Sequence, residues 1–305
     1  WPPRAATSTL VIEAPRRGPP EPPRRTGCPR LGYDRGVPPS RHRGAALGPT
    51  IAALFLVALA LRPPIVGIGP LLPAIERSLA IGHGPAGLLG AIPVLCMGIF
   101  APLGSWLARR VGPERAIALA VGAVAGFGFL RAIAPNAPAV MATTFAIGVG
   151  IGLTGPILPI VVHDRVPERA ALATGAYATG IILGATVAGA VAVPLAGPAG
   201  EWRRTLAVFA LAGAASLLAW LGLEGRNGRQ SRPAPADDLD PPAIPWRDRR
   251  GWSLALVFGL QSVLFYAVVA WLPLIQIERG WSEVSAGFLV AVMNAVSLVS
   301  VLAVP

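Results

Sequence analysis

A single arginine interrupts the first long apolar stretch of the chain. Arg62 is the only charged residue between Arg43 and Glu76. A charge near the centre of a membrane-spanning helix costs at least ~2.5–3.5 kcal/mol, so such a residue usually faces a cavity and has a partner. Its planar guanidinium carries five donors, which suits a small planar or carboxylate-like anion. This placement predicts that Arg62 binds an anionic or polar planar solute; if the helix instead ends at Leu61, Arg62 reaches the outer membrane interface.

Uncharged polar residues within the apolar stretches are further candidates for the same binding site. An amide or hydroxyl in a membrane span needs a hydrogen-bond partner, which a polar substrate can supply. Gln261 and Tyr266 are five residues apart, about 140° around a helix, so they do not share one face. Each candidate could equally contact only neighbouring helices, and that alternative stays open. Besides Arg62, the candidates are Gln261, Tyr266, Asn294, Thr154 and Tyr177.

Metal and cofactor chemistry finds no support in the residue spacing. Cys28 and Cys96 are far apart, as are the three histidines, and they form no ligand pattern. Gly150, Gly152 and Gly155 fit the dinucleotide-binding glycine pattern, but they lie in an apolar stretch with no strand before it. We therefore predict no metal and no cofactor.

Charge is scarce and unevenly distributed along the 305 residues. Only 13% of the residues are charged and 53% are hydrophobic, whereas a soluble domain has about 25% charged residues. The uncharged runs between the charges are long enough for a helix to cross a bilayer. The net charge of +11 lies in a tail and in loops beside these runs, so membrane topology explains it better than nucleic-acid binding. The sequence predicts an all-α membrane protein with helices at about 45–75, 85–108, 114–133, 138–162, 169–195, 203–223, 252–276 and 283–305.

Proline and arginine clusters divide the chain into regions. Residues 1–44 contain ten prolines and nine arginines, which predicts a disordered tail without a signal peptide. No methionine precedes Met97, so we expect the tail to include upstream sequence or the chain to be a fragment. The expected regions are the tail at 1–44, a six-helix bundle at 45–223, a cytoplasmic linker at 224–250 and the first two helices of an incomplete second bundle at 251–305.

The arginines also predict how the helices cross the membrane. With a cytoplasmic N-terminus, twenty arginines lie in inner segments and five in outer ones, at positions 77, 131, 203, 204 and 279. Because basic residues concentrate on the cytoplasmic side, this count favours a cytoplasmic N-terminus in the inner membrane.

A short repeat links the first and fourth predicted helices. Gly69-Pro70-Leu71-Leu72-Pro73 recurs as Gly155-Pro156-Ile157-Leu158-Pro159. The second copy lies three helices after the first, so it is inverted in the membrane, as in transporters built from inverted repeats. Proline removes a backbone donor, so both helices are expected to lose hydrogen bonds there, with carbonyls freed towards a cavity. A kink that only serves helix packing is the alternative, and it stays open.

Several segments resemble the major facilitator superfamily, and within it the cyanate/2-nitroimidazole transporter family. The first-helix segment Leu61-Arg62-Pro63-Pro64, with the Gly69–Pro73 motif, looks like that family. Similar segments are Pro93-Val94-Leu95-Cys96 and, further on, Phe258–Ser262 through Tyr266 to Pro273. The resemblance implies the superfamily fold of twelve helices, of which eight are visible here. The superfamily's aspartate between the second and third helices is missing from Gly104–Gly112, so no latch built on it is expected.

Together these patterns indicate a secondary transporter, not an enzyme. Two six-helix halves would move alternately around a central site, and the resemblance points to cyanate- or nitroimidazole-like solutes. The expected partners are a small-molecule substrate and the lipid bilayer, with the protein a monomer. Three alternatives stay open. The first is a membrane-embedded enzyme acting on lipid or prenyl substrates, for which His163, Asp164 and Glu168 are the nearest group of acids and histidines. The others are a channel and a truncated paralogue that does not transport.

Overall fold

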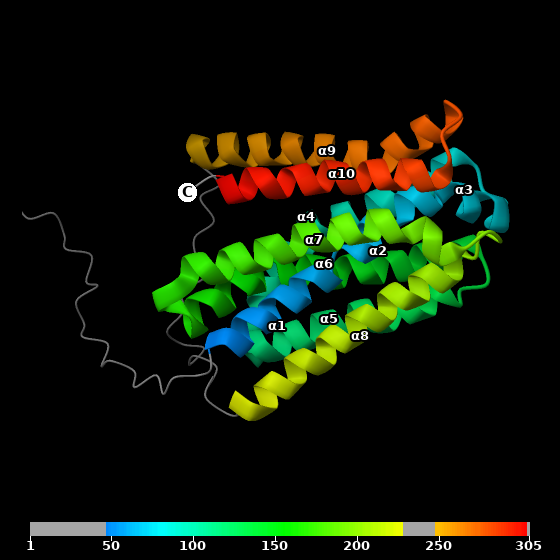
Figure 1. Cartoon of the computed structure of the whole chain (residues 1–305). Helices are drawn as coiled ribbons and strands as arrows, with labels where there is room; N and C mark the ends of the chain where they lie inside the picture. Colours follow the sequence, from blue (N-terminus) through cyan, green and yellow to red (C-terminus); the bar gives the residue numbers. More distant parts are fainter. Residues whose placement is uncertain (1–46, 228–247, 304–305) are drawn as a thin grey trace, which may run out of the picture. The chain divides into compact units, whose positions relative to one another are not determined.

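A computed structural model describes residues 47–227 and 248–303, with side chains at 48–223 and 248–297. Within these residues every regular element is helical (Figure 1). The predicted tail and most of the predicted linker lie outside the described residues, and the division into regions stays a prediction. The helices are α1 (Leu47–Ala60), α2 (Pro63–Val66), α3 (Ile68–Leu79), α4 (His83–Val111), α5 (Pro113–Ala132), α6 (Ala137–Arg165), η1 (Pro167–Arg169), α7 (Ala170–Ala196), α8 (Trp202–Asn227), α9 (Arg249–Glu278) and α10 (Glu283–Ala303).

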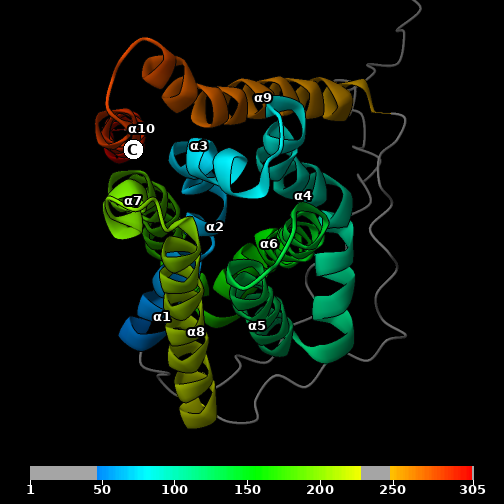
Figure 2. The same cartoon turned by 90° about the vertical axis from the view of Figure 1, so that its right-hand side faces the viewer.

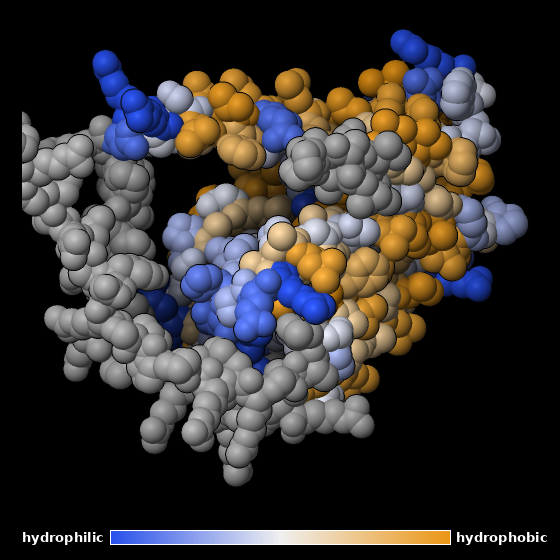
Figure 3. Space-filling model, turned by 60° about the vertical axis from the view of Figure 1, so that its left-hand side comes forward, coloured by the Kyte–Doolittle hydropathy of each residue, from blue (hydrophilic) through white to orange (hydrophobic). Residues whose placement is uncertain are grey.

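These helices confirm the all-α membrane architecture expected from the charge pattern. Seven segments within the described residues are long and apolar enough to cross a bilayer, and α10 adds a shorter apolar stretch, Glu283–Ser297. The predicted first span is the composite of α1, α2 and α3. On the face shown in Figure 3, apolar residues cover the helix flanks, and most strongly hydrophilic residues lie towards the helix ends. Such a distribution matches a protein whose flanks contact hydrocarbon.

The first span is broken at the predicted place. Pro63 and Pro64 lack backbone donors, so two consecutive hydrogen bonds to the preceding turn are lost and α1 ends at Ala60. The chain continues as one short turn, in which the amides of Ile65 and Val66 both donate to the Arg62 carbonyl over 3.0 Å. Gly67 then separates this turn from α3. The break places Arg62 between two helical segments, with its side chain half-buried.

The corresponding break predicted in the fourth span is absent. α6 runs without interruption from Ala137 to Arg165 and contains both Pro156 and Pro159. These prolines are separated by two residues, so each removes a single hydrogen bond, which a helix tolerates by bending. The repeat in sequence therefore does not produce two broken helices.

Glycines allow the central helices to approach closely. α6 lies between α4 and α5 (Figure 2), and a Cβ added at Gly148 or Gly152 would come within 2.8 Å of Pro93 Cα or 2.7 Å of the Cys96 carbonyl oxygen. α7 packs on α1 in the same way through Gly180 and Gly184, where an added Cβ would clash with the backbone of α1. Both helix pairs are therefore closely packed at glycine. Gly126 on α5 differs, because a Cβ added there meets nothing within 4 Å.

This difference gives a matched pair of variants. Gly184→Ala is expected to destabilise the protein by about 1–3 kcal/mol, because its Cβ would clash with the Leu59 carbonyl group and the helices must separate. Gly126→Ala should instead stabilise α5 by up to about 1 kcal/mol, since alanine is the better helix former and the space is open. Thermal unfolding midpoints of the two purified variants check this; equal midpoints would contradict the α1–α7 contact.

The last two described helices, α9 and α10, form a second group that packs against the first group, α1 to α8. α10 lies along α7, while α9 packs against α10 and against α3 (Figures 1 and 2). Val269 and Val290 join the buried cluster that also contains Leu71, Leu72 and Phe209. The break in the first span and the middle of α9 therefore face each other.

Candidate functional site

Arg62 and Tyr266, 204 residues apart in the chain, meet between the broken first span and α9. The Arg62 Nη1 donates a hydrogen bond to the Tyr266 hydroxyl. Its guanidinium carbon lies 6.0 Å from the centroid of the Tyr266 ring, at the limit of a cation–π contact. The Tyr266 hydroxyl in turn donates to the Met97 sulfur on α4, 3.7 Å away. The broken first span, α4 and α9 thus meet at the Tyr266 hydroxyl.

No carboxylate neutralises Arg62 within the described part of the chain. The ion pairs recorded there join Arg77 to Glu283, His83 to Glu76 and Arg165 to Glu114. Arg62 lies fifteen residues after the start of α1 and seventeen before the end of α3, so it is far from both ends of the composite span. A half-buried guanidinium whose only side-chain partner is a neutral phenol retains donors for an anion.

The other predicted site residues do not join this pair. Thr154 is fully buried, and its hydroxyl donates to the Gly150 carbonyl of its own helix over 2.9 Å. The Asn294 amide, 2% exposed, likewise donates to Val290 over 2.8 Å. Gln261 is exposed on α9. Tyr177 is half-buried and packs against the same core cluster as Tyr266. Their roles in binding remain predictions, and the geometry favours only Arg62 and Tyr266 as a contacting pair.

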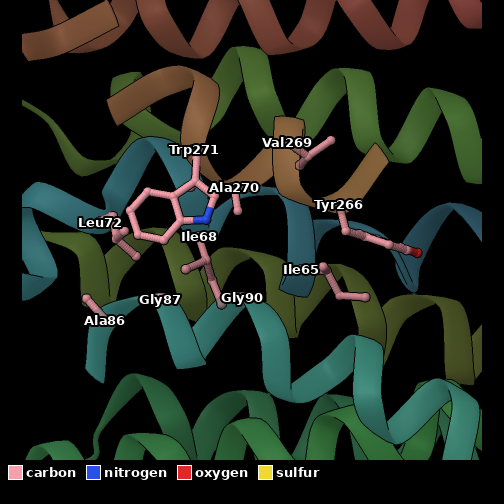
Figure 4. Close-up of a pocket in the computed structure, with 11 residues that line it drawn as sticks. Ile65, Ile68, Leu72, Ala86, Gly87, Gly90, Tyr266, Val269, Ala270 and Trp271 are labelled. Atoms are coloured by element: carbon pink, nitrogen blue, oxygen red, sulfur yellow. The ribbon is translucent and has the colours of Figure 1, made fainter. Parts of the chain in front are cut away.

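A narrow pocket lies beyond Tyr266, between α3, α4 and α9 (Figure 4). The Trp271 indole forms one wall opposite Leu72 and Ala86, and the Tyr266 hydroxyl points away from it. The volume open to the centres of water-sized molecules is only about 20 Å³, room for about one water. A Cβ at Gly87 would approach Trp271 to 3.2 Å. The pocket is therefore nearly closed.

Further contacts close the same end of the helices. Arg77, in the last turn of α3, forms a 3.1 Å ion pair with Glu283 in the first turn of α10. An added Cβ at Gly69 would lie 3.0 Å from the Val269 carbonyl oxygen, so α3 and α9 are in near backbone contact. The first half of α9 is different: Trp252 and Leu260 are 56% and 57% exposed. The first group (α1 to α8) and the second group (α9 and α10) are therefore in close contact at the end that contains Arg77 and Glu283, and we call this the tight end. Along the first half of α9 the two groups are separated.

Arg131 has a place that the sequence did not predict. The sequence counts it among the outer segments, at the end of the helix predicted at 114–133; it lies in the last turn of α5, but it is 1% exposed. Its Nη1 donates to the Pro64 carbonyl over 3.2 Å, while its Nε has no partner within the described residues. The guanidinium therefore satisfies a carbonyl in the break next to Arg62. Met97 was missed as well, because a thioether in an apolar run has no signal beyond its hydrophobicity.

Comparisons with known proteins agree with this architecture. The Major Facilitator Superfamily model matches residues 47–305. The chain is 30% identical over 244 residues to the cyanate transport protein CynX of Escherichia coli (strain K12), covering 80% of this chain and 62% of the relative. It is 29% identical over 255 residues to the 2-nitroimidazole transporter of the same organism, covering 84% and 64%. The chain thus spans less than two thirds of these relatives' length.

Two solved structures share the fold. A bacterial homologue of the human lysosomal transporter Spinster, in an inward-facing and unoccupied conformation, superposes with a TM-score of 0.66 at 19% identity, covering 83% of this chain and 61% of that one. The D-xylose-proton symporter gives 0.62 at 14% identity, covering 83% and 66%. These likenesses concern the fold, whereas the family match covers nearly all described residues. The chain belongs to the Major Facilitator Superfamily and is a multi-pass membrane protein.

Proposed function

We propose that this protein is a secondary transporter that moves a small anionic or polar planar solute across the inner membrane. The observation that carries the proposal is the Arg62 guanidinium, half-buried in the middle of a broken span, without a carboxylate partner among the described residues. Its planar fork can bind a carboxylate-like or linear anion, and Tyr266 offers a hydroxyl and a ring face beside it.

The transported solute is proposed from chemistry and from the relatives together. One relative is named for cyanate and another for 2-nitroimidazole, and both names describe small planar or linear solutes. A single guanidinium with one phenol suits solutes of this size, because few other polar side chains reach the pair. Gln261, Asn294, Thr154 and Tyr177 would contribute only after a movement of the helices.

The arrangement of the helix ends supports alternating access. Arg62 and Tyr266 belong to helices before and after the predicted linker, so relative movement of the two groups would open or close their contact. If the N-terminus is cytoplasmic, the tight end with Arg77 and Glu283 is the outer one. The described state would then be inward-facing.

This orientation is tested by fusion reporters. A reporter inserted at 226–248 is expected to be cytoplasmic, and one near 197–201 external, because inner segments hold twenty arginines and outer segments five. Arg131 is buried, but leaving it out of the outer segments still gives twenty inner arginines against four outer ones. External activity at 226–248 together with cytoplasmic activity near 197–201 would reverse the assignment.

The transport proposal itself is tested with the full-length protein in proteoliposomes. Labelled cyanate and 2-nitroimidazole are the probes, and labelled glucose is the neutral control of different shape. We expect saturable uptake of at least one probe, and counterflow when the vesicles are preloaded with the unlabelled compound. A flux that rises linearly with concentration and shows no counterflow would indicate a channel. Chemical conversion of the probe would indicate an enzyme.

A further inference from the structure

An apolar groove runs along the outside of α4, α5 and α6, away from Arg62. Its lining is entirely apolar and includes Leu107, Leu119, Phe127, Phe145, Ala146 and Leu153. The volume open to the centres of water-sized molecules is about 270 Å³, far more than the 20 Å³ of the pocket beside Trp271. Leu119 and Phe145 are 58% and 49% exposed, so the groove opens on the flank. In a bilayer this flank contacts hydrocarbon chains rather than water.

Three exposed arginines lie at one end of this groove. Arg110 follows Leu107 by three residues on α4, and Arg115 precedes Leu119 by four on α5, so both arginines share helix faces with groove-lining leucines. Arg109 is exposed beside them. Within residues 47–227 and 248–303 none of the three forms an ion pair; nearby Glu114 is paired with Arg165 instead. The end of the groove therefore carries unneutralised positive charge.

A tryptophan marks this end as a membrane interface. The Trp106 ring, 48% exposed, lies 5.1 Å from the Arg110 guanidinium carbon. Tryptophan and arginine together are typical of the depth at which lipid headgroups meet acyl chains. The opposite end of the groove lies near Phe145, whose ring packs edge-on against Phe100 with centroids 5.8 Å apart. The groove is thus apolar along its length and basic at one end only.

We propose that this groove binds an anionic phospholipid: one acyl chain lies against α5 and α6, and the phosphate is bound by Arg110 and Arg115. The charge complementarity favours a lipid over a second copy of the chain, whose apolar flank would leave these arginines unpaired. Basic sites between transmembrane helices at the cytoplasmic side are known to suit anionic headgroups. The site does not depend on the proposed transport function.

Native mass spectrometry of the purified full-length protein tests this site, because it resolves each bound lipid by mass. Dioleoyl phosphatidylglycerol is titrated against dioleoyl phosphatidylcholine, which has the same chains and no net charge. Arg110→Gln combined with Arg115→Gln is expected to weaken phosphatidylglycerol binding about 30-fold, from the usual attraction of two basic residues to an anionic headgroup. The matched control is Arg204→Gln combined with Arg279→Gln, which removes the same charge from exposed positions elsewhere. Ala146→Phe narrows the groove and should also weaken binding.

The possible results separate the sources of the binding. Preference for phosphatidylglycerol that disappears in the Arg110/Arg115 variant and persists in the control supports the site. Equal binding of the two lipids, or an equal loss in the control, would overturn it. Inorganic phosphate that displaces the lipid completely, with no effect of Ala146→Phe, would show that only the headgroup is bound and would overturn the groove. A dimer in lipid-free protein that Ala146→Phe dissociates would assign the groove to a second copy.

Discussion

Replacing Arg62 with alanine is expected to reduce the initial rate of uptake at low solute concentration at least about 30-fold, because the loss of a charged partner inside a binding site costs about 2–5 kcal/mol. Arg62→Lys should retain part of the activity, since it keeps the charge but loses the planar fork. Tyr266→Phe keeps the ring and removes only the hydroxyl, so its loss should be smaller, about five- to tenfold. Initial rates in proteoliposomes, normalised to inserted protein, measure all three.

The control for Arg62 is another arginine with little structural role. Arg204 is exposed near the start of α8, so Arg204→Ala should leave uptake unchanged. If Arg62→Ala transports like the wild type while inserted in equal amount, Arg62 is not part of the solute site. Its interaction with Tyr266 would then serve only to connect the helices.

The second large effect is expected at the tight end of the helices. Gly69→Leu should reduce uptake about tenfold or more, because its side chain would enter the space between α3 and the Val269 carbonyl, 3.0 Å from an added Cβ, and over-packing costs about 1–3 kcal/mol. The state that is closed at this end would be less populated, and the transport cycle would slow.

Gly126→Leu is the matched control, since a Cβ added at this position on α5 meets nothing within 4 Å. Uptake by the two variants is compared at equal amounts of inserted protein. Each variant also receives Trp271→Cys, and the rate at which a thiol reagent modifies this cysteine is measured. Faster modification in the Gly69 variant than in the control is expected, because the tight end is held open. Normal uptake by Gly69→Leu would contradict the requirement for this contact.

The span pattern was predictable because, apart from Arg62, the charges of the described spans lie at or near the helix ends. Each uncharged run became one helix or, at Pro63-Pro64, a broken one. The double proline made that break predictable, since it removes two consecutive donors. The same reasoning failed at Pro156, because a motif repeat does not reveal whether single prolines can be accommodated within a continuous helix.

The site was predictable only in part. Arg62 was identified because a lone charge in an apolar run needs a partner. Tyr266 was among the candidates, but its direct contact with Arg62 could not be predicted, since a separation of 204 residues in sequence carries no distance. Asn294 and Thr154 were plausible site residues because a polar side chain in an apolar run also needs a hydrogen-bond partner. Each of them instead donates to a carbonyl of its own helix. The burial of Arg131 could not be predicted, because a charge in the last turn of a helix is compatible with both an exposed and a buried side chain.

Direct binding tests the central claim, that Arg62 with Tyr266 forms the solute site. Isothermal titration of the purified full-length protein with whichever probe it transports gives the affinity without the transport cycle. We expect one site in the wild type, an affinity at least about 30-fold lower in Arg62→Ala, and an intermediate value in Tyr266→Phe. Unchanged affinity in an Arg62→Ala protein that keeps the wild-type unfolding midpoint would contradict the account.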